Sequence, residues 1–434
     1  MFQDKLSKKA GLNEDFGFDP AIIDYVILSH AHIDHSGCLP RLVKLGFNGP
    51  VFATPATVDL CEIMLADSAR IQESDVKYKN RRLLAQGKKL LKPLYTEADV
   101  ERTMKLFVPV VYNKIFEITD GISFQFSDAG HIIGSAAVHL ELTENGKTKY
   151  LSFTGDIGRY HDLILREPQT FLQADYIICE STYGDRLHEE MGDAAKKLLE
   201  IVRHTCLDKK GKLIIPAFSL GRTQEIVYTL DRMRTNGLLP KIPVYVDSPL
   251  STSATSIMRK HSAAFNNDIQ KYMQTDPDPF AFKELKFIRD PEESKALNTS
   301  HEPCIIISAS GMADAGRIKH HLKNNLGKKR NTVLMVGYCA LHSLGRQLMD
   351  GAKEVKIFGE IHPVIAEVMS LQAYSAHADY KEMLRYLECQ DPKKVKRIFL
   401  VHGELPVQEN WREKLIAAGF ANVAIPEFKE IIEI

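Results

Sequence analysis

Four residues with metal-ligating side chains occur within six positions of one another: His30, His32, Asp34 and His35. They directly follow the apolar run 25–29, which is typical of a buried strand. Side chains two residues apart in an extended segment point the same way, so His30 and His32 can bind one metal ion. Asp34 and His35 come where the chain turns toward a predicted helix, and they can bind a second ion. Imidazole and carboxylate groups are suitable zinc ligands, and a catalytic zinc keeps one position open for water.

Two metal ions need more ligands than this cluster provides. Three further candidates each follow an apolar segment and lie beside a glycine: His131, Asp156 and His402. The adjacent glycines allow close backbone approach because they carry no Cβ atom. Each of the three could be structural if taken alone. Together with the first cluster, they predict a set of seven ligands for two metals.

The segments that position these residues are predicted to be strands that alternate with helices. Strands are predicted at 25–29, 50–53, 149–153, 175–179, 212–216, 243–246, 304–308, 332–336 and 397–401, and helices at 39–45, 222–234 and 381–387. This alternation predicts an α/β architecture. Five of the strands lead into polar residues suited to chemistry: His30, Asp156, Glu180, Asp247 and His402. Ligands collect beyond the carboxyl ends of strands in α/β sheets, so we expect these five residues to form one site.

Composition sets broad limits on the function. The chain has 434 residues and a formal net charge of zero, which rules out a strongly basic overall field. This argues against a nucleic-acid binder that works by bulk charge, without excluding one. No apolar run approaches the roughly 18–20 residues of a membrane span, so no membrane association is expected. The seven cysteines are scattered and form no C-x-x-C pair. This pattern argues against a disulfide framework and favours a cytoplasmic location.

The motifs together resemble a known family. His30-x-His32-x-Asp34-His35, Gly130-His131 and Gly155-Asp156 resemble the signature of the metallo-β-lactamase fold. Stretches 180–185, 217–225, 247–249, 308–322, 374–379 and 401–404 look like the additional motifs of its β-CASP branch. The most similar types are the bacterial and archaeal RNA-processing nucleases and the nuclease subunit of the pre-mRNA 3′-end cleavage factor. The likeness covers the chain from Met1 to about Gly403.

This resemblance implies an α/β fold, an αββα sandwich with an inserted α/β β-CASP domain. The sandwich is expected to comprise 1–183 and 372–434, and the insertion 184–371. Family members begin with a hairpin that ends in a turn similar to Met1–Gln3, so the N-terminal hairpin of the family is expected to be missing here. We expect either a start further upstream or a truncated member. A truncated sheet would expose an edge, with poor solubility and weakened metal binding.

The resemblance also implies roles for the candidate residues. His30, His32 and His131 would bind one Zn²⁺; Asp34, His35 and His402 would bind the other; and Asp156 would bridge them, with Mn²⁺ as the alternative metal. The implied reaction is attack of a hydroxide on phosphorus. Asp34, Glu180 and His377 are the expected catalytic residues, with His377 as general acid or transition-state stabiliser beside the Glu180 carboxylate.

The expected partner is RNA, because members with His at the position of His402 act on RNA, whereas DNA-repair members tend to carry Val. Residues 186–372 contain 27 Lys and Arg against 21 Asp and Glu, so this portion is basic and the remainder acidic. Dimers are common among the relatives, so we expect a homodimer. The expected substrate-binding residues are Asp185, Ser219, Arg222, Ser308, Ser310, Gly311 and Ser375.

Several alternatives stay open at this point. The protein could act on DNA, hydrolyse small esters or thioesters, or be a scaffold without metal, and the sequence does not distinguish internal cleavage from trimming at an end. The segment 77–92 carries seven basic residues and no acidic one. It predicts either a solvated helical face or a contact surface for phosphates.

Overall fold

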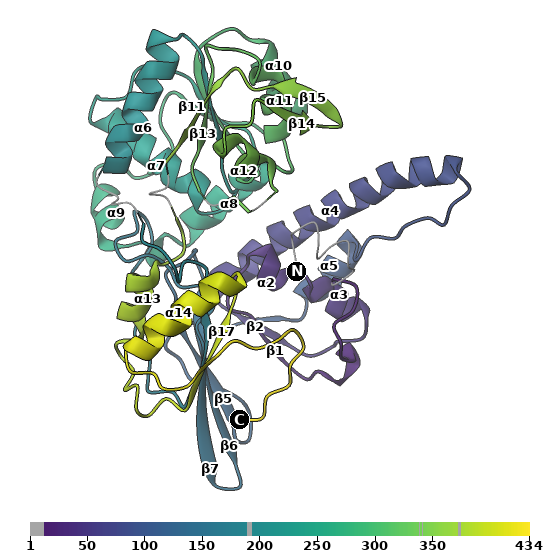
Figure 1. Ribbon diagram of the computed structural model, residues 1–434, viewed down its shortest axis with the longest axis vertical. Helices are drawn as coiled ribbons and strands as arrows, with labels where there is room; N and C mark the ends of the chain where they lie inside the picture. The colour runs from purple at the N-terminus through teal and green to yellow at the C-terminus, as the bar shows by residue number, and fades with distance from the viewer. Residues whose placement is uncertain (1–12, 189–192, 338, 341, 372–374) are drawn as a thin grey trace. The chain divides into compact units, whose positions relative to one another are not determined.

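The computed structural model describes residues 13–188, 193–337, 339–340, 342–371 and 375–434. The chain divides into two compact units, and each is described by itself (Figure 1). Unit 1 comprises Met1–Leu187 and His377–Ile434, and unit 2 comprises His188–Ala376. The turn predicted at Met1–Gln3 lies outside the described residues. Among the helices of the described ranges, none combines the length and apolar character needed to cross a bilayer.

Unit 1 contains two sheets. The larger has the strand order β18-β17-β8-β7-β6-β5-β4. Its strands are β4 (Phe116–Thr119), β5 (Ile122–Asp128), β6 (Ala136–Glu144), β7 (Lys147–Phe153), β8 (Tyr176–Glu180), β17 (Arg397–Val401) and β18 (Val423–Ala424). Neighbours from β4 to β7 are antiparallel and neighbours from β7 to β18 are parallel. The carboxyl ends of β7, β8 and β17 therefore lie at one edge of this sheet.

The smaller sheet packs on the larger one. Its parallel strands are β1 (Val26–Ile27), β2 (Val51–Ala53) and β3 (Phe107–Pro109). Phe52 of β2 packs in one apolar cluster with Phe124 and Phe126 of β5, and this cluster joins the two sheets. The helices of unit 1 are α2 (Ile33–Ser36), α3 (Leu39–Lys44), α4 (Pro55–Ala85), α5 (Glu97–Met104), α13 (Tyr380–Leu387) and α14 (Leu405–Ala417), with a 3₁₀ turn at Pro20–Ile22.

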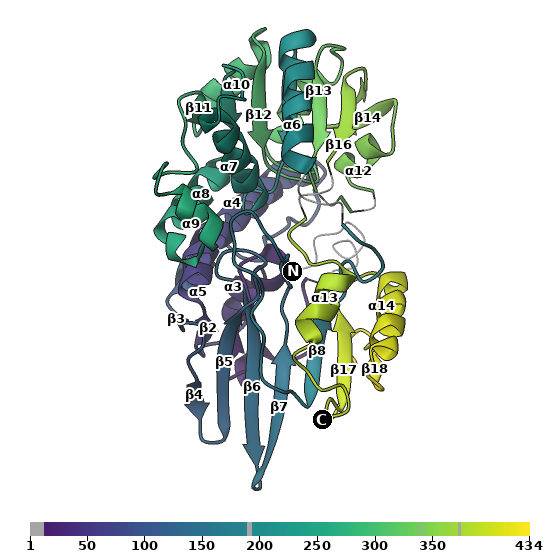
Figure 2. The ribbon, with the colours of Figure 1, turned by 90° about the vertical axis from the view of Figure 1, so that its left-hand side faces the viewer.

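Helices α13 and α14 cover one face of the larger sheet, as Figures 1 and 2 show. Tyr386 of α13 and Trp411 of α14 are fully buried against Ile177 and Ile398 of the sheet. Helix α13 begins with a capping box in which Asp379 and Glu382 satisfy each other's backbone N–H groups. His377 lies two residues before this cap, so the start of α13 fixes its position.

Unit 2 is built on a parallel sheet with the order β11-β10-β12-β9-β13-β16. Its strands are β9 (Lys212–Pro216), β10 (Val244–Val246), β11 (Leu285–Phe287), β12 (Cys304–Ser308), β13 (Thr332–Met335) and β16 (Glu367–Ser370), and a separate hairpin consists of β14 (Glu354–Ile357) and β15 (Glu360–Pro363). Every residue of β9, β12 and β13 is buried, as expected for parallel strands covered on both faces.

Helices accompany the strands of unit 2. They are α6 (Ala194–Val202), α7 (Arg222–Thr235), α8 (Pro249–Lys260), α9 (Asn267–Tyr272), α10 (Pro291–Thr299), α11 (Ile318–Asn325) and α12 (Leu344–Met349), with a π-helical turn at Arg203–Asp208 and a 3₁₀ turn at Ser262–Ala264. Ile318 and Leu322 of α11 pack with Ile214 of β9 in one buried cluster. The strands and helices predicted from the sequence are present, with ends that differ by a few residues.

Segment 77–92 differs from the helical face predicted for it. Helix α4 continues only to Ala85, and the chain then turns through Gly87, whose φ is +61°. A left-handed residue of this kind ends a helix, and glycine adopts it without steric cost. The second half of the segment is therefore an irregular chain that returns along the helix, not a continuation of it.

Candidate metal centre

The ligand candidates of the first motif are positioned by a tight turn between β1 and α2. His32 is the N-cap residue of α2, and Asp34 and His35 lie in its first turn. The Ser36 hydroxyl donates to the carbonyls of Ala31 and His32 at 2.8 and 3.0 Å. These two bonds fold segment 30–35 back on itself, so that His30 and His32 face one group of ligand atoms and Asp34 and His35 face another.

The remaining candidates come from loops at one edge of the larger sheet. His131 lies between β5 and β6, Asp156 follows β7, and His402 follows β17. His402 has a φ of +55°, which is uncommon for a residue other than glycine. Such a conformation persists only where the surroundings impose it, and it is frequent at functional sites. All of these side chains belong to unit 1.

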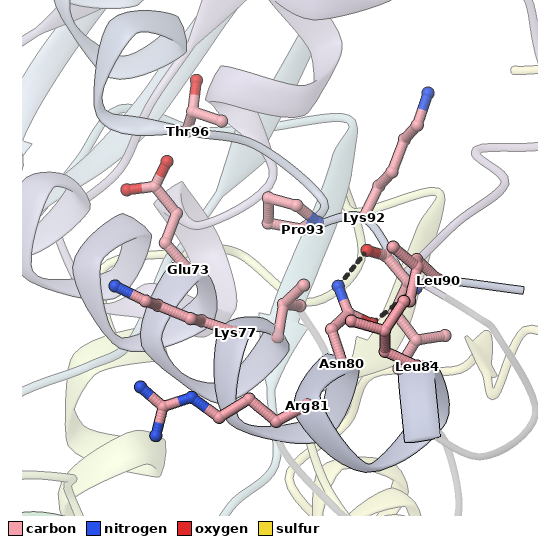
Figure 3. Close-up of a pocket in the computed structure, with 11 residues that line it drawn as sticks. Glu73, Lys77, Asn80, Arg81, Leu84, Leu90, Lys92, Pro93 and Thr96 are labelled. Carbon is pink, nitrogen blue, oxygen red and sulfur yellow. Dashed lines mark hydrogen bonds between the residues drawn. The ribbon is translucent and has the colours of Figure 1, made fainter. Parts of the chain in front are cut away.

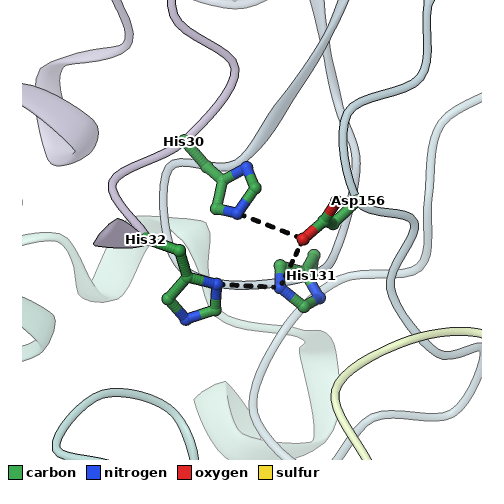
Figure 4. Close-up of side chains that lie close together, drawn as sticks. All are labelled: His30, His32, His131 and Asp156. Atoms are coloured by element: carbon green, nitrogen blue, oxygen red, sulfur yellow. Dashed lines mark hydrogen bonds and ion pairs between the residues drawn. The ribbon is translucent and has the colours of Figure 1, made fainter. Parts of the chain in front are cut away.

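The first group of ligand atoms consists of three imidazoles and one carboxylate (Figure 4). The Oδ2 atom of Asp156 lies 3.3 Å from Nε2 of His30 and 3.6 Å from Nε2 of His131. His131 Nε2 lies 3.2 Å from Nδ1 of His32. The four ligand atoms all fall within 4.8 Å of one another, a spacing at which one ion can contact all of them.

A second group lies on the other side of Asp156. Its Oδ1 atom is 3.4 Å from Nε2 of His35 and 3.6 Å from Nδ1 of His402. Asp34, His35 and His402 also form a group within 4.8 Å, and Nε2 of His402 lies 3.1 Å from Oδ2 of Asp34. The two oxygens of Asp156 thus face different groups, which is the arrangement a bridging carboxylate requires.

The electrostatics of these groups fit divalent cations. Burial lowers the pKa of His30 and of His131, and it lowers that of His32 to about 3, so these imidazoles stay neutral and able to bind metal. Although burial opposes ionisation of Asp156, His402 and other histidines outweigh it and lower its pKa well below the usual value. A buried carboxylate that stays charged needs a cationic partner.

Hydrogen bonding gives an independent test of the same fit. His30 Nε2, His35 Nε2 and Asp156 Oδ1 are buried atoms without a hydrogen-bond partner. Buried polar atoms are usually satisfied, so three such atoms facing the same small space need an explanation. A bound ion explains all three, because each atom then coordinates metal.

Glu180 and His377 lie beside the second group, although 197 positions separate them in the chain. His377 Nδ1 lies 3.0 Å from Oε2 of Glu180, whose side chain is 1% exposed. Burial lowers the pKa of His377, but the carboxylates of Glu180 and Asp156 together outweigh burial and the net effect raises it. The protonated form of His377 is therefore favoured relative to that of a free imidazole.

Two residues that the sequence analysis missed lie within hydrogen-bond distance of ring nitrogens of the ligand histidines. The Thr182 hydroxyl donates to Glu180 Oε2 at 2.6 Å and lies 2.9 Å from Nδ1 of His402, from which it can accept. The Ser29 hydroxyl lies 3.1 Å from Nδ1 of His30. Partners of this kind fix the tautomer and orientation of a ligating imidazole. Ser29 immediately precedes His30 and Thr182 lies within the recognised stretch 180–185, so a search of the hydroxyls at these motifs could have found them.

One expectation about the site is wrong. Asp247, which follows β10 as predicted, lies in unit 2 and is fully buried there. Its carboxylate binds Arg317 Nη1 at 2.6 Å, His321 Nε2 at 2.7 Å and the Ser294 hydroxyl. These partners satisfy Asp247 inside unit 2, so four of the five strand-end residues, not five, form the cluster in unit 1.

The predicted substrate-binding residues have varied surroundings. In unit 1, Asp185 pairs with Arg186 at 2.7 Å. In unit 2, Arg222 is buried and pairs with Glu225, and the Ser308 hydroxyl donates to the Asp247 carbonyl at 2.8 Å. The others, also in unit 2, are Ser219 beside Ser248, Ser310 bonded to Ala315, Gly311 against the Phe218 ring, and Ser375. Their substrate role stays a prediction.

Comparisons with known proteins agree with the fold and the centre. Residues 19–153 match the model of a metallo-beta-lactamase superfamily domain, 223–348 that of a Beta-Casp domain, and 361–426 that of a Zn-dependent metallo-hydrolase RNA specificity domain. Fold and site therefore define a metallo-β-lactamase-type metallo-hydrolase with an inserted β-CASP domain. The resemblance seen in the sequence is confirmed.

Whole-chain relatives narrow the class. The chain is 35% identical over 420 residues to Ribonuclease TTHA0252 of Thermus thermophilus, an alignment that covers 96% of this chain and 88% of that protein. It is 33% and 32% identical to Transcription termination factor FttA of Methanosarcina mazei and of Methanocaldococcus jannaschii. The chain spans 58% of the length of each of these two factors. The protein belongs to the β-CASP ribonuclease family.

Proposed function

We propose that the protein is a zinc-dependent ribonuclease that hydrolyses phosphodiester bonds of RNA with two metal ions, in RNA processing or decay. The observation that carries this proposal is the division of the Asp156 carboxylate between two groups of ligand atoms. His30, His32 and His131 would hold one ion, and Asp34, His35 and His402 the other. Two ions held in this way supply an activated water and a positive clamp for phosphate oxygens.

The protein's own side chains then have separate tasks. Asp34 and Asp156 would hold the ions and offset their charge, the first from an exposed position and the second from a buried one. His377, whose pKa Glu180 raises, would donate a proton from its ring to the leaving oxygen of the ribose. Such general acid assistance typically contributes 10²–10⁴-fold to a rate. Glu180 keeps His377 charged and oriented through the bond to Nδ1.

RNA is the substrate best supported among the nucleic acids. The RNA specificity domain match at 361–426 includes both His377 and His402. The relative from Thermus thermophilus, whose alignment covers 96% of this chain, is named a ribonuclease. A homodimer and a cytoplasmic location are further parts of this proposal, and the seven free cysteines support a reducing compartment.

His402→Ala tests the two-metal assignment. We expect the variant to keep the fold by circular dichroism, to bind about one zinc per chain in place of about two, and to lose RNA cleavage. His301→Ala, an exposed histidine in unit 2, is the matched control and should behave as the parent protein. Cleavage of RNA by His402→Ala at the parental rate would refute the assignment.

A further inference from the structure

The second half of helix α4 plays no part in the metal centre, and it extends beyond the packed body of unit 1 (Figure 1). The buried residues of this helix all lie between Ala56 and Ala69. The following helical residues, 70–85, continue for roughly 24 Å at about 1.5 Å per residue. We call residues 70–96, which include the returning chain, the basic arm.

The basic arm has a defined internal structure. The helix ends at Ala85 and the chain turns at Gly87, after which Lys88 N–H donates to the Leu83 carbonyl at 3.0 Å. The side chain of Asn80 donates to the Leu91 carbonyl at 2.9 Å and accepts from Leu91 N–H at 2.8 Å, as Figure 3 shows. This pair of bonds holds the returning chain against the helix. The groove between the returning chain and the helix therefore has a defined shape.

Segment 77–92 of the arm carries charges of one sign only, and the acidic residues of the arm, Glu73 and Asp75, precede it. All seven basic residues of segment 77–92 are exposed: Lys77, Lys79, Arg81, Arg82, Lys88, Lys89 and Lys92. Within the described ranges, none of these seven side chains forms an ion pair or a hydrogen bond. Lys77 and Arg81 lie four residues apart on the helix, where like charges destabilise it. A bound polyanion would relieve this repulsion.

The groove of the arm combines an apolar floor with a basic rim (Figure 3). Its volume is about 580 Å³. The floor consists of Val76, Leu84, Leu90, Leu91 and Pro93. Lys77, Arg81 and Lys92 line it as well, against a single acidic residue, Glu73. Single-stranded nucleic acids bind to such surfaces, because phosphates contact the basic groups while bases pack on the apolar ones.

The N-terminal end of helix α4 contacts the loop that carries a metal ligand. The hydroxyls of Thr54 and Thr57 donate to the carbonyl of Gly134 at 2.6 and 2.8 Å, in the turn that carries His131. Helix α4 also contacts α2, which carries Asp34 and His35. The arm and the metal ligands therefore belong to one packed body. An RNA strand bound to the arm would have a fixed position relative to the metal centre.

We propose that the basic arm is a second RNA-binding surface, which holds single-stranded RNA at nucleotides beyond those at the metal centre. The identity of the polyanion rests on the proposed function. A second copy of this chain is a poorer occupant of the same face. In a twofold dimer the same patch meets itself, so the seven positive charges of segment 77–92 would face the same seven of the other copy.

The test compares two variants of equal charge. The arm variant replaces Lys77, Lys79, Lys88 and Lys89 by Gln, and the control variant replaces Lys105, Lys114, Lys147 and Lys393, which are exposed lysines elsewhere in unit 1. Binding of a labelled 30-nucleotide phosphorothioate RNA, which resists hydrolysis, is followed by anisotropy at several salt concentrations with the metal-loaded proteins. Hydrolysis of ordinary RNA by the parent protein is measured in parallel.

We expect the arm variant to bind this RNA at least about tenfold more weakly at 0.1 M salt. A plot of the logarithm of the binding constant against the logarithm of the salt concentration should become shallower by about 0.7 for each phosphate that a lysine no longer neutralises. The control variant should match the parent. Equal affinity and slope for the two variants would overturn the proposal, as would a change from dimer to monomer in sedimentation without a change in RNA affinity. Failure of the parent protein to hydrolyse RNA would instead contradict the proposed function, because the binding measurement does not depend on cleavage.

Discussion

Replacing Glu180 by Gln tests whether the charge of this buried carboxylate keeps His377 protonated. Glu180 Oε2 lies 3.0 Å from Nδ1 of His377, and the carboxylate gives the largest of the interactions that raise the pKa of His377 against the effect of burial. Gln has nearly the same shape and keeps an acceptor for Ile157 N–H. The substitution therefore removes charge with little change in packing, and we expect the pKa of His377 to fall towards its ordinary value.

The size of the effect depends on pH. An imidazole with a pKa of about 6.5 is protonated in about three quarters of molecules at pH 6 but in only about 3% at pH 8. In the parent protein the raised pKa keeps the proton on His377 until the pH passes that higher value. The cleavage rate of the variant relative to the parent should therefore fall by less than about twofold at pH 6 and by a factor that grows with pH; about thirtyfold at pH 8 is the upper bound, which a fully protonated His377 in the parent would give.

Single-turnover cleavage of end-labelled RNA between pH 6 and pH 9, at saturating metal, measures this ratio. Bound metal acts on both proteins alike, so the ratio reports the Glu180 charge. Glu141→Gln, on the exposed side of β6, is the matched control and should give a ratio near one. A ratio for Glu180→Gln that is the same at every pH would refute the reasoning, because removal of a hydrogen bond alone costs the same rate at each pH.

Three further substitutions test the supports of the centre and the fold. Thr182→Val should weaken metal binding about 10–100-fold in competition with a chelator, because His402 loses its orienting hydroxyl, whereas Thr182→Ser should not. Gly158→Ala should lower the melting temperature and the zinc content, since its Cβ would lie 1.9 Å from the Gly130 carbonyl oxygen; unchanged values would show that this loop yields easily. Trp411→Ala should lower the free energy of unfolding by about 3–5 kcal/mol in urea denaturation; a decrease below about 1 kcal/mol would contradict its place in the core.

The chemistry of the centre could be read from the sequence where it depends on local spacing. The order His30, His32, Asp34, His35 places ligands on different sides of a strand and a short helix, and such geometry follows from backbone periodicity alone. The strands of unit 2 could also be predicted from the sequence. Strands buried on both faces, such as β9 and β12, appear in the sequence as continuous apolar runs.

Helix α4 shows where local patterns fall short. Its segment 77–92 looked like one basic face, and only the turn at Gly87 and the two bonds from Asn80 to Leu91 reveal a groove. The charge pattern by itself was compatible with a solvated face and with a phosphate-binding surface. Which residues face the returning chain is decided by that long-range contact, which leaves no periodic signal in the sequence.

The sequence by itself determined which residues can bind metal and which family the chain resembles, because side-chain chemistry and short spacings are properties of the chain. The tertiary structure decided how they combine. The sheet order places β7, β8 and β17 side by side, so that Asp156, Glu180 and His402 meet at one edge although 246 positions separate the first from the last. The same order brings Thr182 to His402, and unit 2 supplies Asp247 with its own partners. Contacts between distant segments depend on strand order and packing, and these are fixed only when the whole chain folds.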